Sequence, residues 1–337
     1  MKNKGLNSDD INRLFRKTTT VVLTNPSITH EEFVIQLSRM GWKRPILDSE
    51  TSASVLQVFL ESGFFTDTKS AFPDDPDGLN QILKKIFLER GLDFRGYARS
   101  SISRRIENRL KANNIASYGK YEGILDSNQE EYDRLLDELT VTFTQFMRDK
   151  EAFSALRGVV KEHYQKPDQN QLTVWSAGCA TGQEPYSIAM LVAEATRDNN
   201  DNQASIIATD IDQKAIQFAG RGRYEIAAKK EIPEKWNDYF IINENRLELV
   251  PEIQNMVQFQ QHNLTSDAPL AQVDIICCRN VLIYFNIQTQ LRVINQFYRS
   301  LQDSEGYLLL GRYEMLTKEA RNLFSCVDFD ARLYKRK

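Results

Sequence analysis

Residues 172–190, LTVWSAGCATGQEPYSIAM, constrain the fold of this chain more than any other stretch. Thr173, Val174 and Trp175 favour an extended strand, and a short loop with two glycines follows them. Glycine permits tight turns and lets a backbone approach a ligand closely, while Pro185 suits the first turn of a helix. The stretch therefore predicts a strand, a glycine loop and a helix, which is the beginning of a βαβ nucleotide-binding unit.

The first turn of that helix carries Glu184, whereas a phosphate-binding loop leaves the helix N-terminus to an anion or supplies a lysine. A carboxylate at this position favours a ligand with a positive group, such as an ammonium or a sulfonium, over a pyrophosphate. The alternative interpretation is that Glu184 only caps its own helix. The residues of the loop leave both interpretations open.

After residue 166, candidate strands and helices alternate along the chain. The predicted strands are 172–178, 205–211, 256–261, 273–279 and 306–311, and the predicted helices are 184–197, 212–220, 287–302 and 317–324. This order indicates a doubly wound, mostly parallel α/β sheet. The segments around Val327 and Leu333 suggest a closing antiparallel hairpin or edge, and residues 222–250 interrupt the pattern as a small inserted subdomain.

Length and composition are those of a soluble globular protein with room for about two domains, at 337 residues, 41% hydrophobic and 26% charged. A formal charge of −3 argues against a protein that coats nucleic acid through bulk charge. No run of about 18 apolar residues and no signal-peptide pattern occurs, so we expect a cytoplasmic protein without membrane insertion. The four cysteines and three histidines have no metal-site spacing, so we expect no metal.

The chain before the strand–helix alternation divides into two predicted helical parts. Residues 1–72 indicate a mainly helical module of unknown role, whose balanced charge favours docking to an unidentified partner over DNA binding. Two prolines, a glycine and several acids mark a linker at 71–78. Apolar stripes then predict an all-α domain over 78–156, and the nucleotide-binding domain follows over 167–337.

A basic segment lies within this all-α domain. Between Arg90 and Lys111 there are seven basic and two acidic residues, and Ile102, Ile106 and Leu110 form an apolar face. Charge on a helix is often only a solvated face, but a local excess of +5 on an acidic protein indicates an acidic partner surface.

Polar residues follow three of the predicted strands, at ends that would meet along one edge of the sheet. Asp210 could accept both ribose hydroxyls of a nucleoside, and Asn263 could meet an adenine edge. Arg279 and Asn280 end the third strand. Each has a plainer interpretation, since Asp210 could cap a helix, Asn263 could hold a turn and Arg279 could pair with an acid. Three such ends behind one glycine loop favour a nucleoside site.

The segment 139–149, LTVTFTQFMRD, is rich in threonine and phenylalanine. Thr140, Thr142 and Thr144 alternate as in an extended segment, which would place their hydroxyls on one side. The spacing does not decide whether this threonine strip contacts a ligand or bridges two domains.

Four segments, LTVTFTQFMRD, TVWSAGCATGQEPYSIAM, ATDID and DIICCRNVLIYF, resemble in sequence and order the motifs of the CheR-type chemotaxis receptor methyltransferases, over about residues 79–337. That family transfers methyl groups from S-adenosylmethionine to glutamate side chains on receptor helices, leaving S-adenosylhomocysteine. The resemblance implies a Rossmann-like methyltransferase sheet with an antiparallel edge, preceded by an all-α N-terminal region. It implies the cytoplasmic helical domain of chemotaxis receptors as partner, with no nucleic acid and no metal.

The resemblance also implies a set of site residues. The implied cofactor contacts are Thr142, Thr144, Arg148, Gly178, Glu184, Asp210, Asn263, Leu264, Arg279 and Asn280. Tyr284 corresponds to an aromatic residue near the transferred methyl group, so Arg148 and Tyr284 are the implied catalytic residues. The arginines implied to dock the Glu-rich receptor helices are Arg99, Arg104, Arg105 and Arg109. The chain departs from the family pattern at Thr142, where asparagine is frequent.

Three other functions are open on the sequence. A dinucleotide oxidoreductase also uses a glycine loop and a strand-end acid, but this chain lacks a clean GxGxxG and carries Glu184. A nucleic-acid amino-methyltransferase would resemble Pro-Pro-aromatic after Asn280, where this chain has Val-Leu-Ile-Tyr. The third is a non-catalytic, cofactor-binding signalling scaffold of the same fold.

Overall fold

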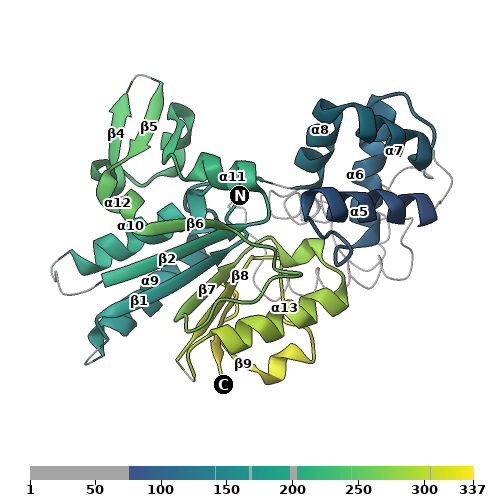
Figure 1. Ribbon diagram of the computed structural model, residues 1–337. Helices are drawn as coiled ribbons and strands as arrows, with labels where there is room; N and C mark the ends of the chain where they lie inside the picture. The colour runs from purple at the N-terminus through teal and green to yellow at the C-terminus, as the bar shows by residue number, and fades with distance from the viewer. Residues whose placement is uncertain (1–75, 141, 167–168, 198–202, 244, 304) are drawn as a thin grey trace, which may run out of the picture. The chain divides into compact units, whose positions relative to one another are not determined.

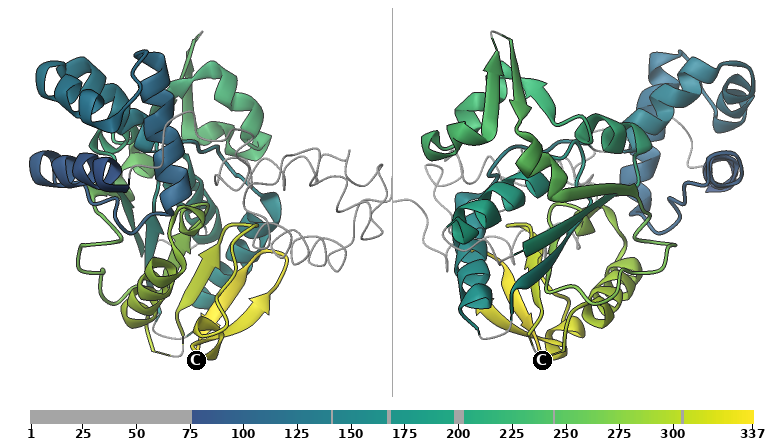
Figure 2. Two further views of the ribbon diagram at one scale, coloured as in Figure 1. Left: turned by 90° about the vertical axis from the view of Figure 1, so that its right-hand side faces the viewer. Right: turned by 60° about the vertical axis from the view of Figure 1, so that its left-hand side comes forward.

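A computed structural model describes residues 76–140, 142–166, 169–197, 203–243, 245–303 and 305–337 (Figures 1 and 2). These residues form two compact units. The described part of the first unit is residues 76–90 and Tyr97–Leu139, and the second unit is Gly91–Gly96 and Thr140–Lys337. The helical module expected at residues 1–72 lies outside the described residues.

Four helices build the described part of the first unit: α5 (Pro76–Arg90), α6 (Arg99–Ala112), α7 (Tyr118–Ser127) and α8 (Gln129–Leu139). Their inward positions repeat at helical spacing, and Ile82, Ile86, Ile102 and Ile106 are all buried. The Ser117 side chain caps α7 by accepting a hydrogen bond from a backbone N–H of its first turn. The all-α region predicted from the apolar stripes is confirmed.

A buried ion pair joins α6 to α8 inside this unit. The Arg109 guanidinium donates to both carboxylate oxygens of Glu131, at 3.0 and 2.5 Å, and the Tyr121 hydroxyl donates to the same carboxylate at 2.6 Å. Glu131 is only 3% exposed, so its charge needs these partners. Arg109 therefore holds α6 against α8, and its implied docking role stays a prediction.

The second unit is built on a seven-stranded sheet. Its strands are β1 (Gln171–Ala177), β2 (Gln203–Asp210), β6 (Val257–Gln261), β7 (Ile275–Cys278), β8 (Tyr307–Leu310), β9 (Phe324–Asp328) and β10 (Leu333–Arg336). They lie in the order β6-β2-β1-β7-β8-β10-β9, where the first five are parallel and β10 is antiparallel to both neighbours. The predicted doubly wound, mostly parallel sheet with an antiparallel edge is confirmed.

Helices cover both faces of this sheet (Figures 1 and 2). The helices α9 (Lys150–Gln165) and α10 (Gln183–Thr196) lie on one face, and α13 (Ile287–Ser300) lies on the other. Successive residues of β1 point to opposite faces. Val174 packs in the core with α9 and α10, while Trp175 meets Phe297 of α13 edge to face. The short helix α11 (Gln213–Ala219) follows β2, and the short helix α12 (Pro251–Asn255) precedes β6.

Helix α9 belongs to the sheet unit, because its Phe153, Leu156 and Val160 are part of the sheet's hydrophobic core. The sequence placed the start of this helix in an all-α domain over 78–156, whereas the structural division falls after Leu139. Periodicity identifies the apolar face of a helix but not the core against which that face packs. The position of this boundary therefore needed the tertiary contacts.

The insert at 222–250 forms a small subdomain with an antiparallel sheet of its own. It comprises β3 (Arg223–Glu225), the 3₁₀ helices η1 (Ile226–Glu231) and η2 (Glu234–Tyr239), β4 (Phe240–Asn243) and β5 (Arg246–Leu249), and its strand order is β3-β5-β4. Tyr224, Trp236 and Leu247 are buried in the same core as α10. The subdomain is thus anchored on the large sheet unit.

One local prediction was wrong. The helix expected over 317–324 is reduced to the 3₁₀ turn η4 (Ala320–Asn322), because Phe324 already starts β9 and pairs with Arg336 of β10. The threonine strip forms no regular element over the described residues 142–149. Beyond the threonines the chain turns, since Met147 and Asp149 have φ angles of 53° and 62°.

Glu194 of α10 holds the insert, and its ionisation predicts a pH-dependent stability. Burial alone would raise the pKa of Glu194, but hydrogen bonds from Lys235, Arg157 and the Trp236 indole lower it from 4.5 to about 2. A depressed carboxyl pKa stabilises the fold above the unfolded pKa, and this contribution is lost as the pH falls from about 4.5 to about 2.

We expect Glu194→Gln to lower the free energy of unfolding by about 1–3 kcal/mol at neutral pH, and the difference from the wild type to vanish near pH 2. Urea denaturation monitored by circular dichroism across this pH range measures both effects. Glu252→Gln, at an exposed position of α12, is the control. Equal stability of Glu194→Gln and the wild type at pH 7 would contradict the prediction.

Candidate functional site

The glycine loop after β1 packs so closely on its neighbours that two positions admit only glycine. Gly178 and Gly182 have φ angles of +81° and +92°. A Cβ atom would lie 2.3 Å from a methyl group of Val281 at the first position and 2.7 Å from Cβ of Ala219 at the second. The backbone N–H groups of Gly178 and Cys179 both donate to the Thr209 carbonyl, at 2.7 and 2.9 Å. The loop is thereby fixed against the end of β2.

Asp210 ends β2 beside this loop. One carboxylate oxygen accepts the Ala180 backbone N–H at 2.8 Å, and the other accepts the Asp212 N–H at 2.9 Å. Burial raises the pKa of Asp210, and the backbone N–H bonds oppose that rise. The helix that follows, α11, is capped by Asp212 and not by Asp210, since the Asp212 side chain accepts hydrogen bonds from the N–H groups of Lys214 and Ala215. A carboxylate has about four acceptor sites, so these two backbone bonds leave it capacity to accept ligand hydroxyls.

A buried ion cluster lies at the start of α10. The Glu184 carboxylate, 8% exposed, accepts from Ser176 Oγ at 2.8 Å and from Arg279 Nη1 at 3.2 Å. Nη2 of Arg279 donates to the Asp149 carboxylate and to the Arg148 carbonyl, each at 2.6 Å. Burial raises the pKa of Glu184, and Arg279 opposes the rise. The Glu184 carboxylate thus bonds to side chains of β1 and of the turn after β7, and Arg279 pairs with acids, as its plainer interpretation expected.

The threonine strip is tied to the same region. The Met147 N–H donates to Ser187 Oγ of α10 at 3.1 Å, and the Phe146 N–H donates to Glu231 of the insert at 3.0 Å. The Arg148 guanidinium lies over the Phe143 ring, with 5.3 Å between its Cζ and the ring centroid. Thr142 and Thr144 on the strip are both half-buried. The irregular strip therefore brings Arg148 into the neighbourhood of Glu184, whose pKa its charge lowers.

Asn263 follows β6, and the oxygen of its side-chain amide is hydrogen-bonded within the loop. Its Oδ1 accepts the backbone N–H of Thr265 at 2.9 Å and the Thr265 hydroxyl at 2.8 Å. Its Nδ2 is buried and has no hydrogen-bond partner among the described residues. Leu264 beside it is 7% exposed. The turn predicted as the plainer interpretation is present, but it leaves one donor for a ligand.

Asn280 and Tyr284 lie in the turn that follows β7. Asn280 has a φ of 61°, and its side-chain Oδ1 is buried without a hydrogen-bond partner among the described residues. Tyr284 closes the 3₁₀ helix η3 (Leu282–Tyr284) and is half-buried. A buried donor on Asn263 and a buried acceptor on Asn280 each cost free energy unless a ligand pairs with them. A nucleoside, which offers both donors and acceptors, fits this requirement.

The structure adds Glu314, which sequence reasoning missed. Its carboxylate lies under the turn after β7 and is 3% exposed. The only signal in the sequence was an acid between Tyr313 and Met315, shortly after the apolar strand β8. That signal is too common to single out one glutamate.

The implied docking arginines belong to α6, which is part of the first unit. Arg99 is exposed and donates to Asn80 at 3.0 Å, and Arg105 donates to the Glu138 carbonyl at 2.7 Å. Arg104 is half-buried. The cofactor residues and the docking residues therefore lie on different units of the chain.

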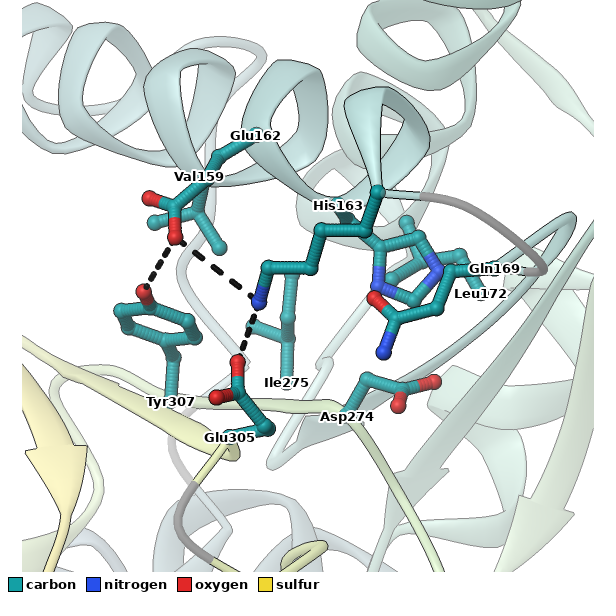
Figure 3. Close-up of a pocket in the computed structure, with 10 residues that line it drawn as sticks. Val159, Glu162, His163, Gln169, Leu172, Asp274, Ile275, Glu305 and Tyr307 are labelled. Carbon is teal, nitrogen blue, oxygen red and sulfur yellow. Dashed lines mark hydrogen bonds and ion pairs between the residues drawn. The ribbon is translucent and has the colours of Figure 1, made fainter.

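A small polar pocket occurs at the amino-terminal ends of the strands, away from these residues (Figure 3). Leu172 at the start of β1 and Tyr307 at the start of β8 line it, together with Lys166, which forms ion pairs with Glu162 and Glu305. None of the implied site residues lines this pocket. Ligands of open α/β sheets bind at the opposite, carboxyl-terminal ends of the strands.

Among the described residues, no group of three or more His, Cys, Asp or Glu side chains is arranged to hold a metal ion. No helix in the same part of the chain has the length and apolar character needed to cross a membrane.

The mostly parallel sheet, the glycine loop with an acid in place of a phosphate-binding lysine, and the strand-end aspartate define an S-adenosylmethionine-binding methyltransferase of Rossmann-like fold. Comparison with protein families agrees. The family model "CheR methyltransferase, SAM binding domain" matches residues 142–333, and "CheR methyltransferase, all-alpha domain" matches residues 77–140. The chain belongs to the CheR methyltransferase family. This membership does not favour the dinucleotide oxidoreductase.

Known relatives are of modest identity. The chain is 29% identical to chemotaxis protein methyltransferase 2 of Pseudomonas aeruginosa, over 71% of this chain and 86% of that protein. It is also 29% identical to an uncharacterised 104.1 kDa protein of Rhodobacter capsulatus, over 85% of this chain but only 30% of that longer protein. Among solved structures, the N-methyltransferase NodS of Bradyrhizobium japonicum matches at 11% identity and a TM-score of 0.33, covering 56% of this chain and 90% of that one. So low a score supports no conclusion about this chain.

Proposed function

We propose that this protein transfers a methyl group from S-adenosylmethionine to glutamate side chains on the cytoplasmic helical domain of a chemotaxis receptor. The observation that carries the proposal is the pair of unpartnered buried groups, Asn263 Nδ2 and Asn280 Oδ1, which follow β6 and β7 at the same edge of the sheet as the Asp210 carboxylate at the end of β2. These groups match a nucleoside, and the family supplies the methyl-donor chemistry. The receptor as acceptor is supported by the names of relatives, such as the Pseudomonas aeruginosa chemotaxis protein methyltransferase.

The reaction suits a site without a general base. A glutamate side chain has a pKa near about 4.3, so it is ionised at neutral pH. S-adenosylmethionine supplies a sulfonium methyl, which the carboxylate oxygen attacks in line while the carbon–sulfur bond breaks and its electrons return to sulfur, giving an ester and S-adenosylhomocysteine. The work of this chain is to hold both reactants in position and exclude water.

The proposed roles follow from the contacts. Asp210 would bind the ribose hydroxyls, because backbone N–H groups hold its carboxylate in place at the end of β2 and leave it further acceptor sites. Asn263 and Leu264 would bind the adenine, and Asn280 would accept a ligand hydrogen bond. Thr142, Thr144 and Gly178 would line the rest of the cofactor site.

The charged groups would bind the amino-acid end of the cofactor. Glu184 would attract its ammonium while Arg279 keeps the glutamate ionised. Arg148 would bind its carboxylate or that of the substrate. Tyr284 would lie near the sulfonium, where a cation–π contact contributes about 0.5–2 kcal/mol.

Methyl transfer itself is the direct test. Labelled S-adenosylmethionine is incubated with the protein and a purified cytoplasmic fragment of a chemotaxis receptor, and base-labile release of labelled methanol reports glutamate methyl esters. We expect label in the fragment, and none with the Asp210→Ala variant. Binding of S-adenosylhomocysteine without transfer to any receptor fragment would instead favour the non-catalytic scaffold.

The docking proposal assigns the receptor surface to α6, through Arg99, Arg104 and Arg105. We expect Arg104→Glu to lower kcat/KM for the receptor fragment by about tenfold at low ionic strength, because like charges then face the Glu-rich helix. The loss should shrink as salt screens the charges. The control is Arg134→Glu, a charge reversal at an exposed α8 position that pairs with Glu130 on the same helix. Equal rates and equal salt dependence for both variants would contradict α6 as the docking surface.

A further inference from the structure

Glu314 accepts hydrogen bonds from the backbone of two neighbouring strand ends. Its Oε2 accepts the N–H groups of Gly311, at 2.6 Å, and Asn280, at 2.9 Å. Its Oε1 accepts those of Val281, Leu282 and Ile283, at 2.8, 2.7 and 3.4 Å. Four of the five donors belong to the turn after β7, and the fifth, Gly311, follows β8. One buried carboxylate thus ties the exits of β7 and β8 together.

The residues that follow β7 and β8 are in close backbone contact, which leaves no room for a side chain at Gly311. A Cβ atom on Gly311 would lie 2.7 Å from the Asn280 backbone nitrogen and 2.7 Å from Glu314 Oε2. Asn280 itself adopts a φ of 61°, which costs free energy for any residue other than glycine. The five hydrogen bonds that the carboxylate accepts from backbone N–H groups offset that cost and hold the turn in this shape.

The same turn borders the cofactor loop. Val281 is the residue that would collide with a side chain at Gly178, so the turn and the glycine loop are in direct contact. Asn280 presents its unpartnered buried Oδ1 from this turn, and Tyr284 follows in η3. The conformation of the turn therefore sets the position of two residues that the proposed function uses.

A carboxylate is needed for this contact because it has two acceptor oxygens and no donor. Burial raises the pKa of Glu314, and the backbone N–H bonds oppose that rise. A glutamine would fit the space but would place an NH₂ group against at least two of the five N–H donors. Those donors would then lose their partner.

We infer that Glu314 is a positioning residue of the methyl-transfer site, which fixes the 280–282 turn so that Asn280 and Tyr284 are preset for the cofactor. The inference rests on the proposed function. Glu314 does not touch the reacting atoms, and its effect passes through the turn.

The test compares Glu314→Gln with Glu305→Gln, which removes a surface carboxylate at the other end of β8. The affinity for S-adenosylhomocysteine is measured by calorimetry at a temperature where circular dichroism shows both variants folded. We expect Glu314→Gln to bind about tenfold or more weakly, with a lower kcat and an unchanged KM for the receptor fragment. Glu305→Gln should match the wild type. A folded Glu314→Gln variant with wild-type affinity and kcat would overturn the inference.

A second measurement needs no variant. In the wild-type protein without ligand, backbone amides of residues 280–282 should exchange with deuterium at least about 100-fold more slowly than in an unstructured peptide, because Glu314 already holds them. Exchange at the unstructured rate would overturn the inference even if Glu314→Gln fails to fold. Wild-type protein that binds no S-adenosylhomocysteine would overturn the proposed function, whereas fast amide exchange in a protein that does bind it would overturn only the inference about Glu314. The two failures are therefore distinguishable.

Discussion

The Asp210→Ala variant is expected to bind S-adenosylhomocysteine at least about 100-fold more weakly than the wild type. The substitution removes the two oxygens proposed to accept the ribose hydroxyls, and hydrogen bonds to a charged group contribute about 1.5–3 kcal/mol each. It also releases the Ala180 N–H that holds the glycine loop against β2. Both effects act on the cofactor site, so the loss of affinity should exceed the loss of stability. Isothermal calorimetry and thermal unfolding measure the two quantities separately.

Asp212→Ala is the matched control for this prediction. Asp212 lies two residues further along, caps α11 and accepts a hydrogen bond from Thr140, so its removal costs a helix cap without touching the proposed ribose contact. We expect this variant to lose about 0.5–2 kcal/mol of stability and to keep its affinity for S-adenosylhomocysteine. Equal affinities of Asp210→Ala and Asp212→Ala would remove Asp210 from the site.

The Arg279→Met variant is expected to lose about 3–5 kcal/mol of unfolding free energy. Methionine fills much of the same space but leaves Glu184 in a buried position without its cation, and it releases Asp149 and the Arg148 carbonyl. Urea denaturation of the ligand-free protein measures the loss. The double variant Arg279→Met/Glu184→Gln removes both charges and should recover part of it.

The sign of the pH dependence provides a further check on this cluster. Burial raises the pKa of Glu184 in the folded protein, so its ionised form destabilises the fold, and protonation at lower pH relieves that cost. Without Arg279 the cost is larger. The stability difference between Arg279→Met and the wild type should therefore shrink as the pH is lowered from neutrality into the acid range. A difference that stays constant as the pH falls would show that Glu184 is not the group left uncompensated.

The sheet was predictable because its strands are short apolar runs separated by clear helical periods. The observed β1, β2, β6, β7 and β8 each lie within about one or two residues of their predicted bounds. The antiparallel edge followed from the two apolar segments at the end of the chain. The insert was predictable from the break in alternation after α11, although its internal strand order was not.

The contacts of charged side chains were not predictable, because the partners are distant in sequence. Glu184 meets Arg279 and Glu131 meets Arg109, and no local pattern links the members of either pair. Glu314 is the extreme case, since all its partners are backbone N–H groups, which leave no trace in the identity of side chains. The turn after the threonines was not predictable for a related reason, since nothing local in the sequence indicates the left-handed backbone of Met147 and Asp149.

The contact between Gly178 and Val281 makes two loops from distant parts of the sequence one steric unit. A residue larger than valine at position 281 would collide with the glycine loop, just as a side chain at position 178 would collide with Val281. The side-chain volumes at the two positions are therefore limited together. Shortening Val281 to alanine would make room beside residue 178, but the φ of +81° there would still disfavour any other amino acid than glycine. An engineer who reshapes this crevice for a bulkier methyl donor must therefore redesign both loops together.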